Sequence, residues 1–207
     1  IEDLCKNSDV IFLTIKPNKA KEVLNEIKDL VKNKLIISFI AGMSLEKLNT
    51  FLLNDNVIRA MPTLGISNGA SPIAFCSSKE IENSTGQEIL NKLGQCIRIE
   101  ESKFDAFTSI FGAGPAYISY LGNLLSEIAL SNGFEDPEPL IRELLKGTYE
   151  IHNSANKPSF NEIKSMVASK GGVTEAALKK IESSGMEEIW KSAIEDAINQ
   201  SKKLGDN

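Results

Sequence analysis

Over the first hundred residues, short apolar runs alternate with segments whose apolar positions recur every three or four residues. A short apolar, β-branched run is typical of a buried strand, and the longer period is typical of an amphipathic helix. The predicted strands cover residues 10–15, 35–40, 56–61, 71–76 and 95–100, and the predicted helices cover residues 19–32, 44–53 and 78–94. This alternation predicts a mostly parallel sheet with helices on both faces.

From about residue 101 onward, the strand-like runs stop and the pattern is helical. Predicted helices cover residues 102–111, 112–133, 137–155, 159–168, 173–184 and 186–204. Two of them carry broad apolar stripes, formed by Tyr117, Tyr120, Leu121, Leu124, Leu125 and Ile128 and by Ile189, Trp190, Ala193, Ile194, Ala197 and Ile198. We therefore predict an α/β part followed by an all-α part, and we expect the stripes to be covered by self-association.

Composition narrows the possible partners. The 207 residues are 42% hydrophobic and carry a net charge of −5, which argues against nucleic acid as the main partner. No apolar run is long enough to span a bilayer, and no basic-then-apolar leader opens the sequence, so we expect no membrane partner and a cytoplasmic location. Cys76 and Cys96 lie in strand-like runs, which predicts buried thiols in a reducing compartment.

The single histidine limits the possible mechanisms. His152 continues an apolar stripe at helical spacing, so we interpret it as a packing residue. With one histidine and dispersed cysteines, the sequence predicts no Ser-His-Asp triad, no Cys–His pair and no metal site. Any chemistry must therefore need little from side-chain acids and bases.

Three predicted strands end in small or rigid residues. The segments TIKP (14–17), IAGMS (40–44) and AMPTLG (60–65) follow the first, second and third strands. Ligands of open α/β sheets bind outside the carboxyl ends of the strands. This edge is therefore predicted to hold a flat ligand, and a dinucleotide fits that description.

Two helices open on glycines, in the segments GAGPAY (112–117) and SKGGVT (169–174). Gly112 and Gly114 would either allow close helix packing or let a cofactor ring approach the backbone. In the second segment, Thr174 would either cap its own helix or lie beside an anion bound at the helix N-terminus. The residues by themselves leave both alternatives open.

Taken in order, strand-KP, strand-AG, strand-R-x-M-P, G-x-G-P-A-Y and V-A-S-x-G-G-x-T resemble the pyrroline-5-carboxylate reductase family over residues 1–204. That family makes proline from its cyclic imine with NADPH or NADH. The resemblance implies part of a Rossmann-like dinucleotide-binding domain over residues 1–100. It also implies a helical dimerisation and substrate domain over residues 101–207, in a homodimer or a larger homo-oligomer.

The resemblance also implies site residues. The substrate, a small cyclic imine carboxylate, would be held by Ser169, Gly171, Gly172, Val173 and Thr174, with Thr174 as the catalytic residue through its hydroxyl. The nicotinamide half of the cofactor would lie along Thr14, Lys16, Pro17, Ala41 and Gly42. Hydride transfer to a protonated imine requires mainly that the substrate and the cofactor be correctly positioned. This requirement agrees with the lack of obvious catalytic acids and bases.

Several positions depart from the family pattern. The motif G-x-G-x-x-G occurs nowhere in these 207 residues, so we expect a fragment of a longer chain that binds a dinucleotide poorly by itself. The loop Met61–Gly65 looks shortened, Ala113 replaces a serine and Lys170 replaces a proline. Two alternatives therefore stay open: another imine or keto-acid reductase on this scaffold, or a degenerate, non-catalytic oligomerising homologue.

Overall fold

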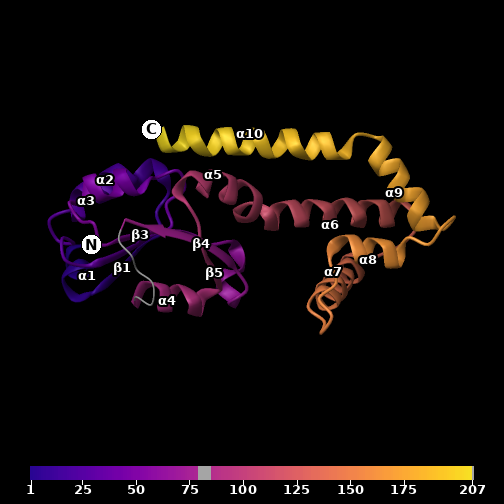
Figure 1. Ribbon diagram of the computed structural model, residues 1–207, viewed down its shortest axis with the longest axis horizontal. Coiled ribbons are helices and arrows are strands. Elements are labelled where there is room, and N and C mark those ends of the chain that lie inside the picture. Colours follow the sequence, from indigo (N-terminus) through magenta and orange to yellow (C-terminus); the bar gives the residue numbers. More distant parts are fainter. Residues whose placement is uncertain (79–84, 207) are drawn as a thin grey trace. The chain divides into compact units, whose positions relative to one another are not determined.

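The computed structural model describes residues 1–78 and 85–206, and its contacts divide the chain into two compact units. The first unit comprises Ile1–Pro115 together with the residues from Ile194 onward, and the second unit comprises Ala116–Ala193. The division between residues 100 and 101, which the hydrophobic pattern and the family resemblance predict, stays a prediction. Figure 1 shows the helices and strands of both units.

The first unit is built on a five-stranded sheet in the described part of the chain, with the strands in sequence order. The strands are β1 (Val10–Leu13), β2 (Leu35–Ser38), β3 (Val57–Met61), β4 (Pro72–Ser77) and β5 (Gln95–Arg98). Each falls within one residue of a predicted range or inside it. Ile37 of β2 pairs in parallel with Ile58 of β3, as expected for strands joined by crossover helices.

One pair of strands is antiparallel. β4 runs against β3, with Ile58 opposite Ser77, while the other three pairs in the sheet are parallel. The segment between β3 and β4 holds only a 3-10 turn, η1 (Leu64–Asn68), and a parallel return would need a longer crossover. The prediction of a mostly parallel sheet is therefore confirmed, with this short return as the exception.

Helices cover both faces of the sheet. The helices of this unit are α1 (Glu2–Asn7), α2 (Pro17–Ile27), α3 (Leu45–Leu52), α4 (Thr85–Leu93) and α5 (Phe104–Phe107), of which α1 was not predicted. Residues 79–84 of the predicted helix 78–94 lie outside the described residues. Leu24 of α2 and Leu48 of α3 belong to one buried cluster, and Leu90 of α4 belongs to another. Figure 1 shows α4 on the opposite side of the sheet from α2 and α3.

The second unit is helical. Its elements are α6 (Gly114–Ser131), which begins in the first unit, α7 (Glu138–His152), α8 (Phe160–Val167), α9 (Val173–Ser183) and α10 (Met186–Asp206), which ends in the first unit.

The predicted helix 102–111, in the first unit, is instead three short pieces: a 3-10 turn η2 (Glu101–Lys103), α5, and a π-helical turn η3 (Thr108–Gly112). The fold class, α/β followed by all-α, is confirmed.

The single histidine packs against neighbouring residues, and the three cysteines are free thiols. His152 Nδ1 lies 3.2 Å from the carbonyl oxygen of Pro158, and its ring centre lies 4.3 Å from that of Phe160, with the two rings tilted by 47°. Cys5 and Cys76 are buried, Cys96 is half-buried, and all three thiols are free. Burial raises the pKa of Cys76 to about 12, so this thiol stays protonated at ordinary pH. Among the described helices, none is both long and apolar enough to cross a membrane.

Candidate active site

The five predicted cofactor residues follow two neighbouring parallel strands. Thr14 comes directly after β1, and Lys16 and Pro17 open α2. Ala41 and Gly42 lie in the loop that follows β2. The Phe39 N–H donates to the carbonyl oxygen of Leu13 at 2.9 Å, which carries the pairing of the two strands beyond their ends. The structure thus brings both groups to the same edge of the sheet, where open α/β sheets bind ligands.

Gly42 is at a position that requires glycine for two reasons. Its φ of +74° lies in the left-handed region, which disfavours residues with a Cβ. A Cβ would also come 2.7 Å from the backbone nitrogen of Gly205, near the end of α10. Lys47 Nζ donates to the carbonyl oxygen of that same Gly205. The turn after β2 therefore packs backbone to backbone against the last part of α10, within the first unit.

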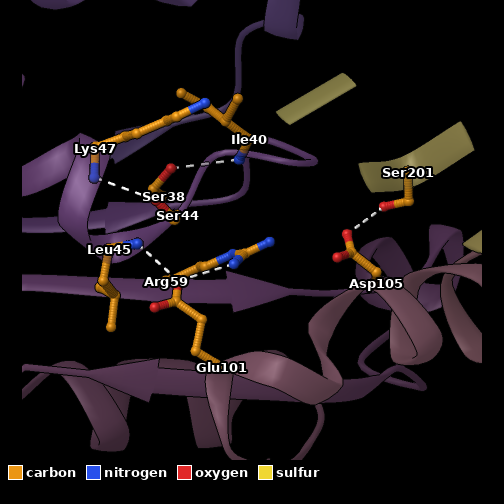
Figure 2. Close-up of polar contacts among 9 residues, drawn as sticks. All are labelled: Ser38, Ile40, Ser44, Leu45, Lys47, Arg59, Glu101, Asp105 and Ser201. Carbon is orange, nitrogen blue, oxygen red and sulfur yellow. Dashed lines mark hydrogen bonds and ion pairs between the residues drawn. The ribbon is translucent and has the colours of Figure 1, made fainter. Parts of the chain in front are cut away.

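An ion pair between a buried arginine and a half-buried glutamate lies beside this turn. Arg59 Nη1 of β3 donates to Glu101 Oε1 at 2.8 Å (Figure 2). The guanidinium lies 4.4 Å from the ring centre of Phe104. The Arg59 side chain is only 5% exposed. A polar cavity of about 300 Å³ adjoins the pair and is lined by Gly42, Ser44, Lys47, Arg59, Glu101, Ser102, Asp105, Lys202 and Gly205.

Sequence reasoning missed this ion pair. The available signal was a charged residue inside the apolar strand VIRAM (57–61), because an arginine there must be paired if it is buried. A further link, between Ser201 Oγ of α10 and Asp105 Oδ1 at 2.6 Å, also lies at this edge (Figure 2).

The loop after β3 is closed by its own side chains. The Thr63 N–H donates to Ser71 Oγ at 2.8 Å, and Thr63 Oγ1 accepts the Gly65 N–H at 3.2 Å. Thr63 is only 7% exposed. The altered segment Met61–Gly65 is therefore an ordered turn whose threonine serves the loop itself.

The packing around the two glycines of GAGPAY leaves room for a side chain at either position. A Cβ at Gly114 would meet nothing within 4 Å, and one at Gly112 would meet Thr108 at an ordinary 3.7 Å. The packing interpretation of these glycines is therefore wrong for the chain by itself. They sit where the π-helical turn η3 gives way to α6, and π-helical turns are frequent at functional sites.

The predicted substrate residues form one continuous loop in the second unit. Gly172 is the N-cap of α9, and Val173 and Thr174 are its first two helical residues. The interpretation of Thr174 as the cap of its own helix is therefore wrong. Gly171 has a φ of +75°, and a Cβ there would meet nothing within 4 Å, so the backbone is open to an approaching group.

The N–H groups of this loop are only partly used. The Gly172 N–H donates to the carbonyl oxygen of Ser169 at 2.9 Å. Within the described part of the chain, no acceptor faces the N–H groups of Val173 and Thr174. First-turn N–H groups carry a partial positive charge and bind anions readily.

One carboxylate already sits on this loop. The Gly171 N–H donates to Glu175 Oε2 at 2.7 Å, and Lys179 Nζ lies 3.1 Å from Glu175 Oε1. The Gly171 hydrogen bond, and after it Lys179, holds the pKa of Glu175 below its usual range. Sequence reasoning missed Glu175, although a glutamate at the third helical position often reaches back to the N-terminal backbone.

Together, the fold and the site define a class: a dinucleotide-dependent oxidoreductase whose sheet is followed by a helical unit with exposed apolar stripes. The family model described as pyrroline-5-carboxylate reductase dimerisation matches residues 101–204. The model described as NADP oxidoreductase coenzyme F420-dependent matches residues 1–42. The chain belongs to the pyrroline-5-carboxylate reductase family.

Individual relatives agree with this assignment. The pyrroline-5-carboxylate reductase of Aquifex aeolicus is 30% identical over 99% of this chain and 78% of the relative. Pyrroline-5-carboxylate reductase 2 of Bacillus subtilis is 28% identical over 96% of this chain and 73% of the relative. The crystal structure of Plasmodium falciparum pyrroline carboxylate reductase with NADP bound superposes with a TM-score of 0.88 at 29% identity, over 99% of this chain and 80% of that one. The family predicted from the motifs is confirmed.

Proposed function

We propose that this chain catalyses the NAD(P)H-dependent reduction of 1-pyrroline-5-carboxylate to L-proline, a step of proline biosynthesis. The observation that carries the proposal is the similarity to the Aquifex aeolicus reductase over 99% of the chain. The match includes both the strand ends and the glycine loop, so neither half of the site rests on a partial alignment.

The substrate carboxylate is proposed to lie on the N-terminus of α9. The N–H groups of Val173 and Thr174 would donate to its oxygens, and the Thr174 hydroxyl would lie beside them. Support comes from the open backbone at Gly171 and from the Gly171 N–H, which binds the Glu175 carboxylate at 2.7 Å. Ser169 and Gly172 shape the turn, through the hydrogen bond of the Gly172 N–H to the Ser169 carbonyl.

The cofactor is proposed to lie at the carboxyl ends of β1 and β2, along Thr14, Lys16, Pro17, Ala41 and Gly42. These residues fit a flat ligand, since Thr14 and Lys16 are exposed at the strand ends and Ala41 and Gly42 are small and half-buried. NADPH is the cofactor to test first, because the Plasmodium falciparum relative was crystallised with NADP, and NADH is the alternative.

When bound, the dihydronicotinamide supplies the hydride. The imine carbon accepts that hydride, and the nitrogen, already protonated, becomes the secondary amine of proline, so no further proton is needed in this step. The chain's contribution is to bind the carboxylate and to orient the imine. Positioning of this kind can supply a large part of a rate enhancement without an acid or a base.

The protein forms a homo-oligomer, in agreement with its dimerisation family model. We propose a homodimer as the basic assembly, supported by the apolar stripe of α6, where Tyr120 is 68% and Ile128 50% exposed. A cytoplasmic location is also proposed, supported by the three free thiols.

The experiment measures NADPH oxidation and proline formation by the full-length protein and by Thr174→Ala and Thr174→Ser. Losing a hydrogen bond to a charged group costs about 1.5–3 kcal/mol, so Thr174→Ala is expected to lower kcat/KM for the imine about ten- to a hundredfold. Thr174→Ser keeps the hydroxyl and should keep most of the activity. An absence of proline formation by the wild type would contradict the reaction. Equal activity of all three proteins would contradict the role of Thr174.

A further inference from the structure

A single carboxylate oxygen joins three segments that are distant in sequence. Glu101 Oε1 accepts a hydrogen bond from Arg59 Nη1 at 2.8 Å and another from the Leu45 N–H at 2.7 Å (Figure 2). Arg59 belongs to β3, Leu45 is the first residue of α3, and Glu101 begins η2. Glu101 thereby connects the middle of the sheet to the start of a helix.

The position of Glu101 is fixed by the arginine. The Arg59 side chain is 5% exposed and stacks over the Phe104 ring. Its Nε is buried without a hydrogen-bond partner in the described part of the chain, and its Nη1 is paired with Glu101. A buried charge that loses its partner is strongly destabilised, and the pair is therefore held together.

The fixed carboxylate in turn binds the first residue after the loop that contains Ala41 and Gly42. Near the start of this loop, Ser38 Oγ accepts the Ile40 N–H at 3.3 Å. At its end, Ser44 caps α3, and Glu101 accepts the N–H of Leu45. A loop whose two ends are fixed loses less conformational freedom when it binds a ligand.

We propose that Glu101 is a positioning residue for the cofactor: through Leu45 it sets the start of α3 and so holds the Ala41–Gly42 turn in its binding conformation, with Arg59 keeping its carboxylate in place. This rests on the proposed function, in which Ala41 and Gly42 contact the dinucleotide. Glu101 itself touches neither reactant.

The neighbouring Glu100 provides a matched control. It forms a surface pair with Lys103 at 3.4 Å, and its side chain is 74% exposed. Glu100→Gln therefore removes the same charge one residue away without disturbing β3 or α3, and exposed pairs of this kind contribute little to stability.

The test measures the dissociation constant of NADPH, by its fluorescence, for full-length wild type, Glu101→Gln, Glu101→Asp and Glu100→Gln. Groups in one hydrogen-bond network are coupled, so we expect Glu101→Gln to weaken NADPH binding roughly three- to thirtyfold. Glu101→Asp keeps the negative charge near Arg59 and should weaken it less. Glu100→Gln should bind as the wild type does, and KM for the imine at saturating NADPH should stay within about twofold in all variants, since the carboxylate loop is untouched.

A merely structural role would lower the melting temperature and leave the NADPH dissociation constant unchanged, which would overturn the proposal. If Glu101→Gln does not fold, the double variant Arg59→Met, Glu101→Gln removes both charges and leaves no buried ion unpaired. It is expected to fold and to show the same weakened binding, and wild-type binding in this variant would equally overturn the proposal.

Ala41→Leu separates this inference from the proposed function. If Ala41→Leu weakens NADPH binding and Glu101→Gln does not, the inference alone is overturned. If Ala41→Leu binds NADPH normally, the proposed cofactor position is wrong and the inference falls with it. Weakened binding in both variants, with normal binding in Glu100→Gln, supports both.

Discussion

The two units bury their apolar side chains to very different extents. In the first unit, buried apolar residues run from Cys5 to Phe107 and include the whole of β3 apart from Arg59. In the described residues of the second unit, no large apolar side chain is buried, and Tyr120, Leu144 and Ile189 are each more than half exposed. The first unit has a core of its own, whereas the second has apolar helix faces without one.

This difference shows what each unit needs in order to be stable. Exposed apolar patches on this scale mark an interaction surface. The apolar residues of α6 recur at helical spacing, so they form one continuous face of the helix. The family model that matches this region is a dimerisation model. The apolar faces of the helical unit are therefore covered by another copy of the chain. The stability of this unit should depend on protein concentration, whereas the stability of the sheet unit should not.

The largest effect is expected in the core of the first unit. Leu48 of α3 is fully buried, and Leu→Ala at such a position typically lowers the free energy of unfolding by about 2–5 kcal/mol. Chemical denaturation at several protein concentrations should show this loss at each of them. Leu64, which is 82% exposed, is the control, and Leu64→Ala should change the free energy by less than about 0.5 kcal/mol. Similar losses in the two variants would contradict the assignment of the core.

A smaller effect is expected on the helical unit, and it should appear in association. Ile128→Glu places a charge on the apolar stripe of α6, and we expect the dissociation constant of the oligomer to rise at least about tenfold, or about 1.4 kcal/mol, by sedimentation. Ser119→Glu is the matched control, because nine residues earlier on an α-helix lies about 180° around the axis. If Ile128→Glu associates as the wild type does, this stripe is not the interface.

Local pattern was enough to predict most of the fold. Each strand is a short apolar run, and most helices carry an apolar face that its spacing reveals, so element type could be read without long-range information. The antiparallel β4 could not be predicted this way, because an apolar run has no direction and the short turn η1 decides it. The break-up of the predicted helix 102–111 likewise depends on tertiary contacts, such as those of the fully buried Phe104.

The candidate site was only partly predictable, for similar reasons. Glycine pairs and strand-end residues can be recognised in the sequence. In the structure, the glycine pair lies on one loop and the strand-end residues lie at one edge of the sheet. Arg59 and Glu101 are 42 residues apart, so their pairing follows from the fold and no local pattern encodes it. Thr174 looked like a helix cap, yet α9 begins one residue before it, since Gly172 adopts the extended cap conformation.

The central claim is that the α9 loop binds the substrate by its carboxylate. The most direct measurement compares kcat/KM of wild type and Thr174→Ala with 1-pyrroline-5-carboxylate and with 1-pyrroline, which lacks the carboxylate. We predict that Thr174→Ala loses about ten- to a hundredfold with the first substrate and less than about twofold with the second, because the lost hydrogen bond exists only when a carboxylate is present. An equal loss with both substrates would contradict the claim and place Thr174 elsewhere in the reaction.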